Sequence, residues 1–535
     1  MLGFTAMPHP QRSTLISMIL LVTTKVTLAQ NPFQDESNAR IPTDLNAGST
    51  MDIAMADLDS DGDDDLVLAK EFRPNQFLQN DGQNRFSAIG GAFGDRVEDS
   101  EDIAIGDFDR DGDLDVVFVS EDTTGNEFYR NSGLGRFTFV AGVIPNNTNS
   151  NAVVAGDLDR DNDLDLVISR NTARELVLLN NGVGNFTDAS NTWMPDVVDV
   201  TQDLKLIDID NDQDLDLIAG NEAANGGRNR LYINTGTRFI DETSTRIPAA
   251  GYAEATRKVS FADVDRDSDI DLFFANADGS STAYTAYRLL FNNGQGVFTD
   301  VTRDRLPAFR RLSMDAEFSD LDQDGDLDLV VADFQQNLQV LANDGTAHFT
   351  DASAAFLGNL VQPRSSIGVF LFESANTRYL FDAGYQDVDR LLVQSKAARL
   401  DSRYSGGFYN PAQNGHGFQF YVLEDQIALT WFTFDTDGST RWVVAQGAIP
   451  EAGDDTAELQ AFRGAGMVFG TFDPSQYQLQ PWGTIRWRTI DCDHAEVRYE
   501  SVVNGANGQP LGNGTIPVAR LVRIPGLDCR SNPSG

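Results

Sequence analysis

The stretch Gly106–Val117, GDFDRDGDLDVV, decides the fold of this chain. It places aspartates at positions 107, 109, 111, 113 and 115 and then turns apolar. Two carboxylates about 4 Å apart repel each other by roughly 1 kcal/mol even in water. The β-branched run that follows is typical of a buried strand. We therefore expect an acidic turn beside a buried strand, with a cation that compensates the charge.

The same pattern occurs six times. The copies are DLDSDGDDDLVLA from Asp57, DFDRDGDLDVVFV from Asp107, DLDRDNDLDLVIS from Asp157, DIDNDQDLDLIAG from Asp208, DVDRDSDIDLFFA from Asp263 and DLDQDGDLDLVVA from Asp320. Each copy has an apolar run on either side, a third run that ends in an Asn-x-Gly type of turn, and a fourth that opens on Phe. Four short strands repeating every fifty-odd residues are typical of β-propeller blades.

A seventh blade is expected without the acidic motif. Ser366–Gln394 keeps three apolar runs but has lost the aspartates. The segment Phe33–Pro42, FQDESNARIP, repeats a phrase that follows fourth strands elsewhere, as in Phe239–Pro248 and Phe298–Pro307. We predict that this N-terminal segment supplies the missing fourth strand and closes the ring, which removes exposed strand edges. The fold class is thus all-β, with a seven-bladed propeller over residues 30–399.

Carboxylates at positions 1, 3, 5, 7 and 9 of each loop suit a hard cation, and Ca²⁺ is favoured because it accepts six to eight oxygen ligands. An EF-hand would need a glutamate at position 12. Position 12 is apolar in every copy: Leu68, Phe118, Ile168, Ala219, Phe274 and Val331. A solvated acidic hairpin without metal is the alternative, and the repulsion repeated in six loops argues against it.

Phe33–Gln394 resembles the FG-GAP/VCBS repeat family, the calcium-binding blades also found in the heads of integrin α-subunits. The resemblance implies about six structural Ca²⁺ ions, each held by the side chains at positions 1, 3, 5 and 9 and by the carbonyl at position 7. The implied side-chain ligands are Asp57, Asp59, Asp61 and Asp65; Asp107, Asp109, Asp111 and Asp115; Asp157, Asp159, Asp161 and Asp165; Asp208, Asp210, Asp212 and Asp216; Asp263, Asp265, Asp267 and Asp271; and Asp320, Asp322, Asp324 and Asp328.

Position 6 of the loop should need a positive φ, which favours glycine. Gly62, Gly112 and Gly325 meet this need, and Asn162 tolerates it. Gln213 and Ser268 are less suited, so we predict weaker sites in blades four and five.

The acidic loop and the Asn-x-Gly turn should share one face of the propeller. Connections on the opposite face vary most in length, and variable loops on a rigid scaffold commonly bind partners. We therefore expect a glycan or protein partner on that face. The aromatic and basic residues that could contact it are Trp193, Arg230, Tyr284, Tyr287, Arg310 and Arg311. Ordinary exposed side chains are the alternative at each position.

No catalytic residue is assigned. After the expected cleavage site the histidines are His348, His416 and His494, and neither a P-loop, a Gly-x-Ser-x-Gly motif nor zinc-ligand spacing is present. His348 occupies a turn position, and we expect a structural role for His416. A polysaccharide-active enzyme (lyase or hydrolase) on the same propeller is the second hypothesis, and a structural spacer without a ligand is the third.

The N-terminus and the charge predict an exported chain. Arg12, the apolar run Leu15–Thr24 and Ala29 are typical of a signal peptide over residues 1–29. We expect an extracellular, cell-surface or periplasmic monomer without membrane insertion. A net charge of -41 argues against a nucleic-acid partner.

Residues 400–535 differ in composition and contain four of the five tryptophans. Alternating apolar runs predict a small antiparallel β-barrel or sandwich. Cys492 and Cys529 are expected to form a disulfide, with two reduced thiols as the alternative. FYNPAQNGHGFQF and WFTFDTDGSTRWVVAQG resemble an uncharacterised module of exported Gram-negative proteins, which implies no activity. The sequence Asp435-x-Asp437-Gly438 is interpreted as a turn.

Overall fold

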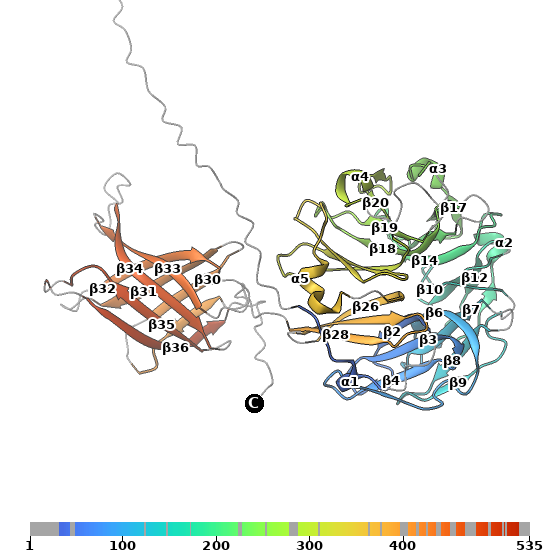
Figure 1. Ribbon diagram of the computed structural model, residues 1–535, viewed down its shortest axis with the longest axis horizontal. Coiled ribbons are helices and arrows are strands. Elements are labelled where there is room, and N and C mark those ends of the chain that lie inside the picture. Colours follow the sequence, from blue (N-terminus) through green and yellow to red (C-terminus); the bar gives the residue numbers. More distant parts are fainter. Residues whose placement is uncertain are drawn as a thin grey trace, which may run out of the picture.

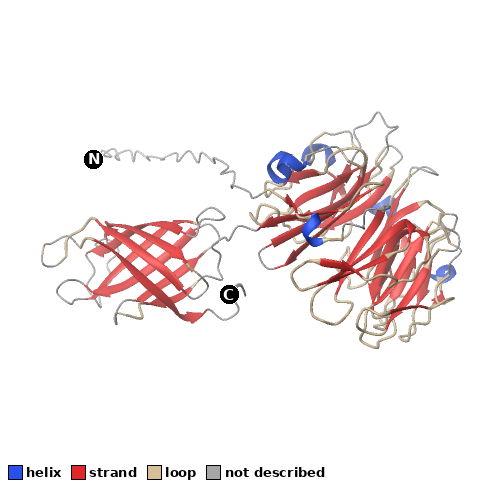
Figure 2. Cartoon of the chain, turned by 60° about the horizontal axis from the view of Figure 1, so that its bottom comes forward, coloured by secondary structure: helices blue, strands red, loops and turns tan. Residues whose placement is uncertain are grey.

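The structure is a computed structural model. It describes residues 32–42, 49–121, 125–145, 148–171, 173–222, 227–251, 254–277, 287–308, 311–361, 364–374, 377–395, 405–412, 417–423, 426–434, 440–449, 456–465, 478–490, 494–505, 508 and 511–523. Strands dominate these residues, and helices are confined to single turns (Figure 2). The expected boundary near residue 399, the expected signal peptide and both cysteines lie outside the described residues.

Seven four-stranded antiparallel blades surround a central axis (Figure 1). Blade 1 has β2 (Thr50–Ala56), β3 (Asp65–Arg73), β4 (Gln76–Asn80) and β5 (Phe86–Ala88); blade 2 has β6 (Glu98–Gly106), β7 (Asp115–Ser120), β8 (Glu127–Asn131) and β9 (Phe137–Phe139); blade 3 has β10 (Val153–Gly156), β11 (Asp165–Ile168), β12 (Leu176–Leu179) and β13 (Thr187–Asp188).

Blades 4 to 7 follow the same plan. Blade 4 has β14 (Thr201–Ile207), β15 (Asp216–Asn221), β16 (Arg230–Asn234) and β17 (Phe239–Asp241); blade 5 has β18 (Thr256–Ala262), β19 (Asp271–Asn276), β20 (Tyr287–Phe291) and β21 (Thr299–Asp300); blade 6 has β22 (Ser313–Ser319), β23 (Asp328–Asp333), β24 (Gln339–Ala342) and β25 (Thr350–Asp351); blade 7 has β26 (Ser366–Ser374), β27 (Thr377–Gly384), β28 (Arg390–Ser395) and β1 (Gln34–Asp35).

The predicted closure of the ring is confirmed. β1 pairs antiparallel with β28, with Gln34 opposite Val393 and Asp35 opposite Leu392. Phe33 is 1% exposed in a core cluster formed mainly by blades 6 and 7. Single helical turns follow several fourth strands: α1 (Ser37–Arg40), α2 (Ser190–Trp193), α3 (Thr243–Arg246), α4 (Thr302–Arg305), and α5 (Ser353–Leu357) with the 3₁₀ turn η2 (Gly358–Leu360).

The innermost strands carry a repeated irregularity. In six blades the register of the first strand shifts by one residue near its start, as between Thr50 and Asp52. A bulge of this kind re-aims a side chain. The residues at the bulge are Met51, Glu101, Gln202, Arg257, Met314 and Ile367. Each lines the central channel, and so do several residues that directly follow a bulge residue.

The C-terminal strands form a closed eight-stranded barrel, so the expected barrel or sandwich is a barrel. Its strands are β29 (Gly406–Tyr409), β30 (Gly417–Val422), β31 (Gln426–Phe434), β32 (Thr440–Ala448), β33 (Thr456–Ala465), β34 (Gln478–Thr489), β35 (His494–Ser501) and β36 (Asn513–Arg523). β29 pairs with β36 to close it. Trp431, Trp482 and Trp487 fill the interior. Among the described residues, no helix is long and apolar enough to span a membrane.

Candidate metal loops and central channel

Each acidic loop is anchored by its ninth residue, which begins the second strand of the blade. Asp65 is fully buried, and its carboxylate accepts backbone hydrogen bonds from Leu58 at 3.3 Å and Asn80 at 2.8 Å. The equivalent Asp165 accepts from Leu158 at 3.0 Å and Asn180 at 2.8 Å. The other blades with an acidic loop repeat the bond from the turn asparagine. This anchor fixes the loop against the Asn-x-Gly turn of the same blade.

The remaining aspartates curl the loop around one centre. In blade 2, Asp107 accepts the backbone N–H groups of Asp111 and Gly112, each at 3.1 Å. Asp111 accepts the N–H of Asp113 at 3.0 Å. As a result, carboxylate oxygens from positions 1, 3 and 5, or 1, 3 and 9, lie within 4.8 Å of one another. Such triads are Asp57, Asp59 and Asp61; Asp107, Asp109 and Asp111; Asp157, Asp159 and Asp165; and Asp208, Asp210 and Asp216.

The loops fit a cation because every one of them keeps a buried carboxylate oxygen without a hydrogen-bond partner. These oxygens are Asp57 Oδ1, Asp115 Oδ2, Asp159 Oδ1, Asp210 Oδ1, Asp265 Oδ1 and Asp320 Oδ1. A buried, unpaired carboxylate oxygen is costly unless a positive charge compensates it. A donor set made of oxygens alone is the kind that Ca²⁺ prefers.

Burial also perturbs the anchors electrostatically. The pKa of Asp115 is raised to about 7 and that of Asp165 to about 6. Burial is the main cause and the charges of nearby aspartates add to it, while backbone hydrogen bonds oppose the rise. In blade 6 the same causes raise the pKa of Asp328 to about 8. A bound cation would favour the ionised form of each anchor.

The turn at position 6 has a positive φ in all six loops, as predicted. The values are 95° at Gly62 and Gly112, 67° at Asn162, 72° at Gln213, 75° at Ser268 and 91° at Gly325. The sequence did not suggest that position 4 is also left-handed, with φ between 58° and 65° at Ser60, Arg110, Arg160, Asn211, Arg266 and Gln323. The weaker sites predicted for Gln213 and Ser268 remain a prediction.

The side chain at position 7 has a different role from its neighbours. Arg110 Nη2 in the second loop lies 2.5 Å from Asp163 Oδ1 in the third, and Arg160 Nε lies 2.6 Å from Asp214 Oδ1 in the fourth. These position-7 carboxylates therefore link neighbouring blades. Because these position-7 side chains are ion-paired to arginines, a metal contact through the backbone carbonyl, as the family resemblance implies, is compatible with the structure. A Cβ on Gly182 would lie 2.7 Å from Asp163 Oδ1, which explains the glycine of that Asn-x-Gly turn.

The turn asparagines also join adjacent blades. Asn131 Nδ2 donates to the carbonyl of Leu58 in the preceding loop at 2.8 Å and to that of Leu114 in its own loop at 3.1 Å. Asn180 repeats the arrangement with Phe108 at 2.8 Å and Leu164 at 3.1 Å. Each acidic loop is thus held by the next blade as well as its own.

The inner strands enclose a channel with a cavity at each end. A cavity of about 390 Å³ lies toward the acidic loops, and one of about 210 Å³ lies toward the opposite face. Both are lined by Met51, Lys258 and Asp315, which therefore mark the waist of the channel.

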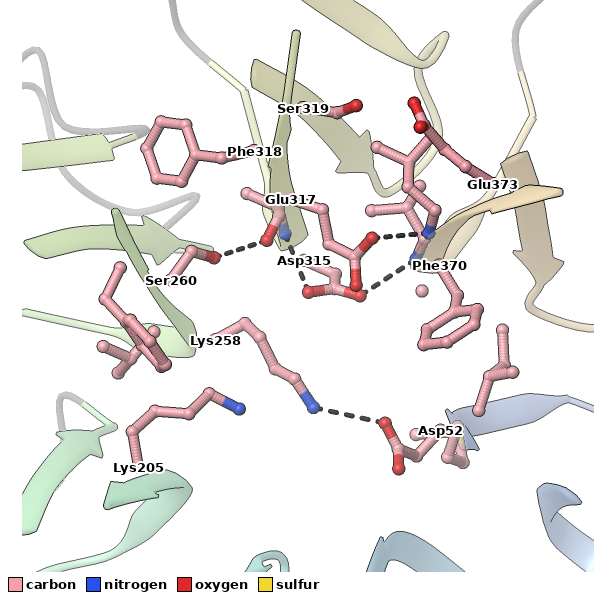
Figure 3. A pocket seen from close by; sticks show the side chains of 18 residues that line it. Asp52, Lys205, Lys258, Ser260, Asp315, Glu317, Phe318, Ser319, Phe370 and Glu373 are labelled. Atoms are coloured by element: carbon pink, nitrogen blue, oxygen red, sulfur yellow. Dashed lines mark hydrogen bonds and ion pairs between the residues drawn. The ribbon is translucent and has the colours of Figure 1, made fainter. Parts of the chain in front are cut away.

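Lys258 crosses the waist, where Figure 3 shows it pointing toward Asp52. Its Nζ lies 3.3 Å from Asp52 Oδ1, 3.7 Å from Asp203 Oδ1 and 3.9 Å from Asp102 Oδ1. Burial disfavours the charge of this lysine, but the surrounding carboxylates outweigh burial and raise its pKa well above the usual value. The ammonium group of Lys258 in blade 5 therefore joins the aspartates of blades 1, 2 and 4.

Two of the predicted partner-contacting residues are buried, and two more are held in ion pairs. Trp193 is 5% exposed and Tyr287 is 3% exposed, because both pack into the cores between blades. Arg230 is held by Asp199 and Asp241, and Arg311 by Asp333. The structure places each acidic loop between the first two strands of its blade, but it does not gather these partner-contacting side chains into one site. Tyr284, Arg310, His416, Asp435, Asp437 and Gly438 lie outside the described residues.

The two histidines in the described part of the chain lie in different domains, His348 in the propeller and His494 in the barrel. His348 lies in the turn before β25, where Thr346 Oγ1 is 2.9 Å and Arg305 Nη1 is 2.6 Å from its Nδ1. His494 is the exposed first residue of β35 in the barrel. The interpretation of His348 as a turn residue is consistent with this placement.

A family model described as FG-GAP-like repeat matches residues 57–118, 107–168, 208–274 and 263–331. These matches start at acidic loops of blades 1, 2, 4 and 5. Residues 57–331 of the propeller therefore contain four FG-GAP-like repeats. No curated protein matches the chain.

Solved structures resemble the chain only distantly. "YCF48 bound to D1 peptide" is 10% identical, covers 69% of this chain and 96% of its own, and has a TM-score of 0.43. "Crystal structure of BBS1N in complex with ARL6DN, soaked with lead" is 11% identical over 68% and 97%, with a TM-score of 0.44. A V. cholerae biofilm matrix protein is 12% identical over 78% and 73%, with a TM-score of 0.34. At such scores these likenesses carry no functional argument, and the strand pairing itself defines the propeller.

Proposed function

We propose that the protein is an exported, calcium-stabilised propeller that binds a glycan or protein partner through the face opposite its acidic loops. One observation carries the choice of face. Equivalent positions of all seven blades line the channel mouth there, and their side chains differ in chemistry: Met51, Glu101, Asn151, Gln202, Arg257, Met314 and Ile367. The acidic-loop face instead repeats nearly the same residues in six blades. Side chains that differ between equivalent positions are not dictated by the fold, and such differences allow a surface to recognise a specific partner.

Calcium would act structurally in this proposal. All six loops keep an unpaired carboxylate oxygen, and the next blade holds five of them through an asparagine side chain and the sixth through Arg378. An ion in each loop would therefore strengthen the contact between blades. A site filled at ten times its dissociation constant adds about 1.4 kcal/mol, and six independent sites would add about 8 kcal/mol.

Thermal melting tests the structural role. The protein should melt at a clearly lower temperature in excess EDTA than in millimolar CaCl₂, and MgCl₂ should restore less of the difference. An unchanged melting temperature in EDTA would sink the proposal that calcium stabilises the ring.

Partner binding is tested with a glycan array and a panel of extracellular proteins, both in calcium buffer. A Gln202→Ala/Met314→Ala variant alters the proposed face, and a Leu134→Ala/Val183→Ala variant alters exposed turns on the acidic-loop face. We expect the first variant to lose the binding that the wild type shows, and the second to retain it. The reverse pattern would show that the partner binds the acidic-loop face, contrary to our proposal. If the wild type binds nothing on either panel, the structural-spacer hypothesis is favoured.

A second candidate, a polysaccharide-active enzyme, is favoured by one observation. Glu317 lines the larger cavity, and burial followed by the charge of Asp315 raises its pKa to about 8. A carboxylic acid that stays protonated near neutral pH can act as a general acid. Release of reducing or unsaturated sugar ends by the wild type but not by Glu317→Gln would support this candidate. Absence of such products across acidic and neutral polysaccharides would count against it.

A further inference from the structure

A second kind of acidic cluster lies at the channel mouth, on the face opposite the repeated loops. Glu71 is near the end of β3, Asp99 and Glu101 are near the start of β6, and Glu121 follows β7. These strand ends are neighbours because Glu71 pairs with Asp99, while the Glu121 N–H donates to the Asp99 carbonyl at 3.1 Å. Blades 1 and 2 thus bring four carboxylates to one place.

The carboxylates are close enough to share an ion. Oxygens of Asp99, Glu101 and Glu121 all lie within 4.8 Å of one another. Glu71, Glu101 and Glu121 line the cavity of about 210 Å³. Burial, followed by the charges of Glu121 and Asp99, raises the pKa of Glu101 well above its usual value. Bringing these groups together is therefore unfavourable unless a positive charge joins them.

The cations that line this cavity are already engaged. Arg257 donates to Gln202 Oε1 at 2.7 Å and to Glu222 Oε1 at 3.0 Å. Lys258 is held at the waist by the aspartates of other blades. In the described part of the chain neither side chain contacts Glu101 or Glu121, so a cation from solution can join these two carboxylates.

A separate observation points to a ligand at the same place. Asn151 lines this cavity, is 6% exposed, and has no hydrogen-bond partner at either polar atom of its side-chain amide within the described structure. Its position follows from the backbone, because Ser169 Oγ accepts the N–H groups of both Asn151 and Ala152, at 2.9 and 2.8 Å. A buried amide that forms no hydrogen bond costs about 1–3 kcal/mol unless another group satisfies it.

We propose that Asp99, Glu101, Glu121 and the side-chain carbonyl of Asn151 bind a hard divalent cation of the Ca²⁺ class at the mouth of the channel. Carboxylate and amide oxygens are the donors that Ca²⁺ accepts in flexible geometry. The described residues lining the cavity include no histidine or cysteine, and the four proposed ligands offer only oxygens, which favours a hard cation, whereas the thioether sulfurs of Met51 and Met314 are not among these ligands. The site goes beyond the proposed function, since it lies at the other end of the inner strands from the repeated loops and does not depend on a partner.

Counting ions on the full chain tests the site. The protein is stripped with chelator, equilibrated with CaCl₂, and examined by native mass spectrometry. Glu101→Gln/Glu121→Gln should bind one ion fewer than the wild type. The matched control Asp95→Asn/Asp196→Asn removes the same charge from exposed positions on the same face and should bind the wild-type number. An unchanged ion count in Glu101→Gln/Glu121→Gln would overturn the proposal.

A melt in EDTA keeps the test interpretable. In chelator the Glu101→Gln/Glu121→Gln variant should melt no lower than the wild type, because it removes repulsion that no ion offsets. If it melts lower, the charge-neutral variant Asn151→Ala replaces it in the ion count and in a calcium titration. Asn151→Ala should weaken the extra site at least tenfold while leaving the other ions in place. Wild-type calcium binding by Asn151→Ala would equally overturn the proposal.

Discussion

Replacing Asp115 by Asn should stabilise the protein in chelator, and calcium should remove most of that gain. Asp115 is fully buried, its Oδ1 accepts the Asn131 N–H at 2.8 Å, and its Oδ2 has no partner. Burial raises its pKa from 3.8 to about 7. At about 1.4 kcal/mol per pKa unit, keeping this carboxylate ionised in the folded chelated protein costs up to about 4 kcal/mol above pH 8.

Asparagine removes that cost and can still accept the bond from Asn131. Asp115→Asn should therefore be more stable than the wild type in EDTA at pH 8, by up to about 4 kcal/mol. In calcium this gain should shrink to about 1 kcal/mol, because a site filled a hundredfold over its dissociation constant contributes about 2.7 kcal/mol that the variant loses.

Urea unfolding followed by tryptophan fluorescence and circular dichroism measures both differences. Asp113→Asn is the matched control, since it makes the same charge change in the same loop at a side chain that packs against Gly133. This control should shift stability by a similar amount in both buffers. A gain in stability for Asp115→Asn that is equally large in EDTA and in calcium would refute the reasoning.

Four further predictions follow from the same geometry. Ser268→Gly should raise the calcium affinity of the fifth loop, because a serine at φ 75° bears roughly 1–2 kcal/mol of strain that glycine lacks, and calorimetric titration would detect the gain. Asn131→Ala should destabilise the ring by about 1–3 kcal/mol in urea, since it leaves the Leu58 and Leu114 carbonyls without this donor. Burial raises the pKa of the anchoring aspartates above the unfolded value, so their contribution to the stability of the chelated protein is full at low pH and is lost as pH rises through about 6 to 8. The calcium-induced rise in melting temperature should therefore grow between pH 5 and pH 8. A rise that is the same at both pH values would contradict this. Deleting residues 32–42 should lower the urea midpoint and cause self-association through the exposed edge of β28, visible by light scattering after size exclusion.

The propeller could be predicted from the sequence because its information is local and repeated. Each acidic motif marks the turn between two strands. The sequence of Phe33–Pro42 matches the segments around the fourth strands closely enough to identify the closing strand. Positive φ at position 6 followed from glycine in three of the six copies. These features depend on neighbours in the chain, which is why residue patterns report them well.

Features that depend on packing between blades were harder to foresee. Trp193 and Tyr287 follow or precede variable loops, yet the adjoining blades bury them. The bulges that aim Glu101 and Arg257 into the channel had a sequence signal, a Ser or Thr one residue before each bulge residue, but the signal does not say which way the side chain points. A ligand role for Asn151 could not be predicted from the sequence, because it depends on carboxylates from other strands that line the same cavity.

The pairing of Gln34 with Val393 also determines when the fold can be completed. The strand β1 finds its partner only after nearly the whole propeller sequence has been synthesised, so the first strand of the propeller must wait for its last blade. Contacts between such distant residues are slow to form, because a long chain has to be closed before the contact repays the lost entropy. Until then the growing propeller is an open arc with unpaired strand edges at both ends.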